Sequence, residues 1–301
     1  MGTKMNTNEF KTYHPIVNFT YFVFVIGLSM VLINPVCVLI SLISAFFYSV
    51  MLKGVKAIKA NLIYMLPMVI LMALFNPIFN HEGATVLAYL PSGNPITFQA
   101  IIYGAVTAVM IISVICWFSC YNEVMTTDKF IYLFGRIIPS LSLVLSMALR
   151  FAPEFTKQFK ALSNAQHMIG KSVTSGSMLT RIKNGASVFS AMITRALENS
   201  VTTADSMKSR GYGLPGRSTF SIFKMRRRDY ITLFFVIVAG VYVFIGKSLG
   251  VTYFNCYPLL EMGEISFYGI TVYLAYSLLC LIPIIIEVRE VIKWKSSEQK
   301  I

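Results

Sequence analysis

The chain has 301 residues, of which 56% are hydrophobic and only 13% are charged, and its formal net charge is +13. Its mean hydropathy of +0.67 lies well above the range of soluble globular proteins. The composition therefore excludes a soluble domain and indicates a multi-pass membrane protein. Basic residues lie beside apolar segments instead of among the stacking aromatics of a nucleic-acid-binding module. We expect no nucleic-acid partner; the lipid bilayer and an acidic protein partner are the expected counterparts.

Apolar runs long enough to cross about 30 Å of hydrocarbon occur six times along the chain. They lie near residues 16–33, 35–52, 61–79, 98–120, 230–246 and 267–286. We therefore predict an all-α integral membrane protein with about six transmembrane helices. In the fourth run, the spacing of Gly104 and Ala108 predicts close packing against a neighbouring helix. The first run is of span length and has no small-residue cleavage site after it, so we expect no cleavable signal peptide.

The placement of Lys and Arg predicts the orientation of these helices. With six spans and a cytoplasmic N-terminus, Lys247 is the single one of 26 Lys and Arg residues that lies on the outer side. Cytoplasmic loops are enriched in these residues. We therefore expect both termini and the long basic region in the middle of the chain to be cytoplasmic.

Three regions follow from this topology. Residues 1–129 hold the first four transmembrane helices, residues 130–228 form a cytoplasmic region, and residues 229–301 hold the last two helices and a tail. Segment 130–149 is apolar enough to be either a seventh span or a helix at the membrane interface. The interface is favoured, because a further crossing would place the basic residues after it on the outer side.

Within the cytoplasmic region, proline and glycine mark helix ends. Pro153 is typical of a first helical turn, with Glu154 near the positive end of the helix dipole. This helix is predicted to run to about Ile169, where Gly170 supplies the C′ position that ends it.

A second, amphipathic helix of about twenty residues is predicted to follow Ser177. Residues 199–205 have weak helix propensity, so we expect a bend there and a short third helix that ends at Arg210 before Gly211. A basic residue in the last turn of a helix stabilises that helix by about 0.3–1 kcal/mol, through its favourable interaction with the helix dipole. Arg210 therefore has a purely structural explanation beside any functional one. Glycine and proline at residues 213, 215 and 216 predict a tight turn after this end.

Several motifs in this region resemble the transmembrane T component, or coupling subunit, of energy-coupling factor transporters, the CbiQ/EcfT-like family. The central motifs are Ala148-Leu149-Arg150-Phe151-Ala152-Pro153, Asn164-Ala165-Gln166, Met207-Lys208-Ser209-Arg210-Gly211-Tyr212 and Gly216-Arg217-Ser218. Similar motifs elsewhere are His14-Pro15, Asn34-Pro35 and the stretch from Leu74 to Asn80. The resemblance covers most of the chain.

The resemblance implies an ABC-type importer of a vitamin or a transition-metal ion in a prokaryotic plasma membrane. Two ABC ATPase subunits would drive uptake, a small membrane subunit would bind the substrate, and this chain would connect them. In the family, each coupling helix ends in an x-Arg-Gly motif that inserts into a groove on one ATPase. Ser209, Arg210 and Gly211 match one motif. At the other, Met168, Ile169 and Gly170 keep the glycine but replace the arginine. This replacement predicts two non-identical ATPases, and an identical pair is the alternative. The resemblance assigns Arg150, Pro153 and Gln166 to the coupling-helix scaffold.

No catalytic motif occurs in the sequence, so we predict a non-enzymatic subunit without a cofactor, and ATP hydrolysis is expected of its partners. Cys116 and Cys120 are expected to be small buried hydrophobes, and the three dispersed histidines predict no metal site. The alternative function is a self-sufficient membrane transporter or channel, which would need polar or charged residues facing inward in several spans. A membrane-embedded enzyme would need a cluster of Asp, His or Cys, and the sequence has none.

Overall fold

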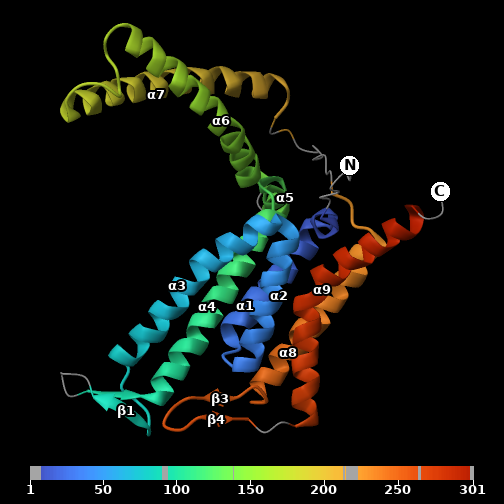
Figure 1. The fold of residues 1–301 in the computed structure, drawn as a ribbon. Helices are drawn as coiled ribbons and strands as arrows, with labels where there is room; N and C mark the ends of the chain where they lie inside the picture. Colours follow the sequence, from blue (N-terminus) through green and yellow to red (C-terminus); the bar gives the residue numbers. More distant parts are fainter. Residues whose placement is uncertain are drawn as a thin grey trace. The chain divides into compact units, whose positions relative to one another are not determined.

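The structure, a computed structural model, describes residues 8–89, 94–137, 139–212, 214, 223–263 and 266–298. These residues are mostly helical (Figure 1), and the predicted all-α fold is confirmed. The chain forms two compact units, one of Met1–Phe130 with Phe223–Ile301 and one of Ile131–Ile222.

The first unit is a helical bundle with two short antiparallel strand pairs. Its helices are η1 (Glu9–Thr12), α1 (Pro15–Val31), α2 (Pro35–Lys53), α3 (Val55–Phe79), α4 (Phe98–Val124), α8 (Arg227–Ser248) and α9 (Phe267–Glu298). Strand β1 (Val86–Tyr89) pairs with β2 (Pro95–Thr97), and β3 (Phe254–Asn255) pairs with β4 (Glu261–Met262). Helix α5 (Thr127–Ile137) begins in this unit, and α6 (Pro139–Met168) and α7 (Met178–Ser209) make up most of the second.

The six predicted spans all lie on helices of the first unit. Among the described residues, four helices are long and apolar enough to cross a membrane, namely α2, α4, α8 and α9. The other two predicted spans correspond to shorter apolar helices, Pro15–Val31 and the second half of α3. Segment 130–149 lies on α5, described to Ile137, and on α6, described from Pro139, and residue 138 lies outside the described residues.

Two proline motifs in the sequence are helix starts. The side chain of His14 accepts a hydrogen bond from the backbone N–H of Ile16, and Pro15 occupies the first turn of α1. Asn34 caps α2 in the same way, with Pro35 in the first turn. A polar cap followed by proline is favourable, because proline has a suitable φ and no N–H that would need a partner.

The core of the bundle is aromatic and contains a small polar network. Phe10, Tyr21, Phe22, Tyr48 and Trp117 are fully buried and pack mainly edge to face. Beside them, Ser41 Oγ lies 2.7 Å from Ser29 Oγ and accepts a hydrogen bond from the Trp117 indole at 3.0 Å. These buried polar groups therefore satisfy one another.

Helices α3 and α4 approach closely at Gly104, as the sequence predicts. A Cβ atom at this position would lie 2.9 Å from the Cβ of Asn76 and 3.3 Å from the carbonyl oxygen of Met72. Asn76 also donates to the carbonyl of Ala100 at 2.7 Å. Glycine is required here because any side chain would push the two helices apart.

Candidate functional site

The helix that contains Arg150 and Pro153 begins earlier than the sequence predicts. Pro153 lies inside α6, whose first residue is Pro139, so the prediction of a first-turn proline at residue 153 is wrong. The residues between the two prolines, such as Leu145 and Met147, are good helix formers and extend the helix toward its start. Pro153 has no N–H to donate to the carbonyl of Leu149, so one helical hydrogen bond is missing there.

Helix α7 is continuous from Met178 to Ser209, so the predicted bend at residues 199–205 is also wrong. The hydroxyls of Thr202 and Thr203 donate to the carbonyl of Asn199 at 3.0 and 2.7 Å. These side chains therefore bond within the helix instead of competing with it. The predicted turn at residues 213, 215 and 216 lies outside the described residues.

Helices α6 and α7 end in the same hydrogen-bond pattern. At the end of α6, Gly170 N donates to the His167 carbonyl at 3.0 Å and Lys171 N donates to the Gln166 carbonyl at 2.9 Å. At the end of α7, Gly211 N donates to the Lys208 carbonyl at 3.0 Å and Tyr212 N donates to the Met207 carbonyl at 3.1 Å. This pattern is the Schellman motif, and the C′ glycines have φ of 79° and 75°.

The two matching ends present different side chains. Ile169 and Arg210 occupy the same position, directly before the C′ glycine. Both are exposed, and Met168 beside Ile169 is 88% exposed. Ser209, beside Arg210, bonds back to the Ser206 carbonyl at 2.9 Å. One helix end therefore offers an apolar pair to a partner and the other offers a guanidinium group.

The contacts within the second unit place these ends far apart. The loop after α6 folds onto the first turns of α7, where Asn184 donates to the Ser172 carbonyl at 2.8 Å and Arg181 to the Val173 carbonyl at 3.2 Å. The C-terminal end of α7 instead lies beside the first half of α6. The helices are thus antiparallel. Because α7 has 32 residues at about 1.5 Å each, roughly 48 Å separates its two ends.

A cleft of about 700 Å³ lies between α6 and α7 and brings Arg150 and Arg210 to one place. Glu154 lines it as well, together with Phe151 and Tyr212. The structure thus joins two of the residues that the sequence predicts, whereas Gln166 lies near the other helix end, where its carbonyl closes the Schellman motif. Sequence reasoning missed the cleft, because its walls are about sixty residues apart in the chain.

Several apolar side chains of α7 do not pack into a core. Ile182, Phe189, Ile193 and Leu197 recur at helical spacing, and their side chains are 46–63% exposed. In contrast, Val188 on the same helix is fully buried. A continuous exposed apolar stripe of this kind marks a surface that binds a protein or a membrane. We call these four residues the α7 stripe.

These features define a multi-pass helical membrane protein whose second compact unit is built mainly of two long helices. A protein-family model described as CbiQ, cobalt transport protein, matches residues 8–222. The chain belongs to this family, and the predicted resemblance to CbiQ/EcfT-like T components is confirmed.

Two curated relatives have the same name, energy-coupling factor transporter transmembrane protein EcfT. The chain is 29% identical to the Lactobacillus helveticus protein over 106 residues, which cover 35% of this chain and 38% of that protein. It is also 29% identical to the Staphylococcus aureus protein over 120 residues, which cover 40% of this chain and 45% of that protein. The chain therefore matches less than half the length of either relative.

Proposed function

We propose that this chain is the coupling subunit of an energy-coupling factor importer. In this role it links two ABC ATPase subunits to a small membrane subunit that binds a vitamin or a transition-metal ion. ATP hydrolysis belongs to the ATPases, and this chain transmits their motion. Family membership and the names of its relatives support the proposal.

The observation that carries the proposal is the pair of matching helix ends. Two Schellman motifs in one antiparallel helix pair, separated by roughly the length of α7, give two docking points for two separate proteins. Arg210 would pair with acidic groups of one ATPase, and Met168 with Ile169 would make apolar contacts with the other. Motion of the two ATPases relative to each other would then move the two ends of one rigid element.

The α7 stripe suits the substrate-binding subunit. That partner is itself expected to be a membrane protein with an apolar surface, and the stripe offers apolar area that this chain leaves exposed. The rival function, a self-sufficient transporter or channel, has less support. The bundle holds a group of buried polar side chains that bond to one another, namely Ser29, Ser41, Trp117 and Tyr276.

The proposed role requires the second unit to be cytoplasmic, which cysteine labelling can test. Tyr89 in β1 is exposed in the first unit, and Ser175 is exposed in the loop between α6 and α7. In intact cells, an impermeant thiol reagent should label Tyr89→Cys and should label Ser175→Cys only after permeabilisation. The wild-type chain is the control, because its five native cysteines are all buried. Labelling of Ser175→Cys in intact cells would contradict the cytoplasmic location.

Co-purification tests the function itself. The tagged chain, extracted from its native membrane in mild detergent, should carry two ATPases and one small membrane protein in stoichiometric amounts. Uptake should require all four chains. Substrate uptake by this chain alone, reconstituted in vesicles, would instead establish the self-sufficient transporter.

A further inference from the structure

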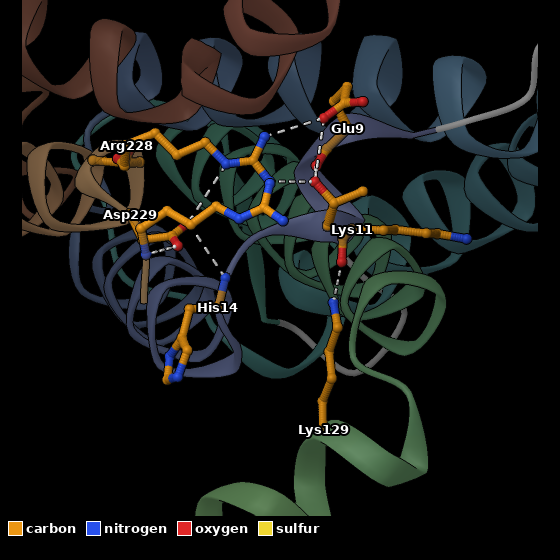
Figure 2. Close-up of polar contacts among 9 residues, drawn as sticks. Glu9, Lys11, His14, Lys129, Arg228 and Asp229 are labelled. Carbon is orange, nitrogen blue, oxygen red and sulfur yellow. Dashed lines mark hydrogen bonds and ion pairs between the residues drawn. The ribbon is translucent and has the colours of Figure 1, made fainter. Parts of the chain in front are cut away.

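The second unit is attached to the bundle at two points, because the chain leaves the first unit after Phe130 and returns to it at Phe223. A buried charged residue lies close to each attachment point. Lys129 comes just before the first point, and Asp229 comes shortly after the second. Both contact the same short segment, residues 9–14 (Figure 2). We call this segment the N-terminal clasp.

Lys129 ties the clasp to the first attachment point. Its Nζ donates to the carbonyl of Lys11 at 2.6 Å and to that of Val124 at 3.1 Å. The Asn18 amide, oriented to satisfy both of its ends, accepts from the same Nζ at 2.8 Å and donates to the Phe10 carbonyl at 3.1 Å. Burial, together with the Lys11 charge, lowers the pKa of Lys129 to about 8. A buried ammonium is costly unless polar groups replace its water, so Lys129 depends on the clasp.

Arg228 ties the clasp to the second attachment point. Its guanidinium lies 3.4 Å from the Glu9 carboxylate, donates to the Thr12 hydroxyl at 2.8 Å and stacks 4.7 Å from the centre of the Tyr13 ring. Next to it, the carboxylate of Asp229 faces the clasp backbone. Five side chains and the backbone N–H of His14 thus join the start of α8 to the clasp.

Phe10 anchors the clasp in the bundle. Its ring is fully buried, with ring centroids of Tyr21 at 5.2 Å and Tyr48 at 6.3 Å. Helix η1, which holds Glu9 and Phe10, also packs against α9. The clasp therefore cannot move without exposing aromatic core.

From these contacts we propose that the N-terminal clasp fixes the spacing of the two attachment points of the second unit. Lys129 and Arg228 are its positioning residues. The proposal rests on the coupling role given above. A fixed spacing lets motion of the helix ends reach the bundle, whereas loose attachment points would absorb that motion by bending the ends of α4 and α8.

The spacing can be measured directly in the full chain. Spin labels at Thr127→Cys and Lys224→Cys, both exposed positions, report the distance between the attachment points by pulsed electron paramagnetic resonance in lipid nanodiscs. We expect one narrow distance distribution for the otherwise wild-type chain and a broader one for Lys129→Met and for Arg228→Gln. Arg227→Gln makes the same charge change at the neighbouring exposed residue and should leave the distribution narrow.

Milder variants keep the test informative if Lys129→Met fails to fold. Glu9→Gln removes only the clasp side of the ion pair and should broaden the distribution as Arg228→Gln does. The double variant should give a distribution no broader than that of Arg228→Gln alone, because Arg228→Gln already removes the contact with Glu9. If the distance distributions of Glu9→Gln and Arg228→Gln are as narrow as that of the wild-type chain, the proposal that the clasp fixes the spacing is wrong.

Coupling gives the second readout. The clasp variants should still bind both ATPases and the substrate-binding subunit but should lose uptake. Wild-type uptake by Arg228→Gln would overturn the proposal. If the wild-type chain itself bound no ATPase, the coupling role would fail, whereas the distance measurement would still test the clasp.

Discussion

Arg210→Glu is expected to abolish recovery of the ATPases and substrate uptake while leaving membrane insertion unchanged. Arg210 is exposed at the end of α7, directly before the Schellman glycine. Removing one partner of a buried charge pair at an interface costs about 2–5 kcal/mol, which corresponds to a loss of affinity of roughly thirtyfold or more. The interaction of Arg210 with the helix dipole contributes only about 0.3–1 kcal/mol to helix stability, which is less than the cost of losing the charge pair. Co-purification with tagged ATPases and an uptake assay measure the effect.

Lys208→Glu is the matched control, because it makes the same charge reversal two residues earlier on an exposed side chain of the same helical turn. It should retain both ATPases. Arg210→Lys tests the geometry, since lysine keeps the charge but cannot form two parallel hydrogen bonds to a carboxylate. Recovery of both ATPases with Arg210→Glu at wild-type yield would leave Arg210 with a capping role alone.

Ile169→Asp is expected to weaken ATPase binding at the other helix end, whereas Ile169→Leu should be nearly silent. The Ile169 side chain is 65% exposed and lies beside the more exposed Met168. A partner groove opposite these two residues would be either apolar or acidic, and a new carboxylate is unfavourable in both. The measurements are ATPase recovery and uptake, compared with those of the wild-type chain.

Two controls separate docking from helix stability. A carboxylate at a helix C-terminus also opposes the dipole by about 0.3–1 kcal/mol, and thermal unfolding of the purified chain detects that effect. In Ile169→Asn, the new side chain has nearly the shape of aspartate but carries no charge. This variant should bind the ATPases better than Ile169→Asp does. If Ile169→Asp binds and transports like the wild type, this helix end contacts no partner.

Much of the fold could be predicted because its signals are local. Six apolar stretches predict the helices of the bundle. Gly170 and Gly211 predict the helix ends for the same reason. Only glycine adopts a positive φ at little cost, and both positions require it.

The remainder depends on contacts that one sequence does not reveal. Pro153 suits a first turn and costs a hydrogen bond inside a helix, so its position within α6 depends on the helix-forming segment that precedes it. Thr202 and Thr203 weaken a helix unless their hydroxyls bond back to it, as they do in α7. The clasp joins residues more than a hundred positions apart in the chain, such as Lys11 and Lys129.

The exposed α7 stripe also affects the life of the chain inside the cell. A copy synthesised without its partners carries Ile182, Phe189, Ile193 and Leu197 uncovered. Exposed apolar surface is what quality-control proteases and chaperones recognise, and it promotes aggregation. Surplus copies should therefore be degraded quickly, so that the amount of this protein follows the supply of its partners instead of its own rate of synthesis.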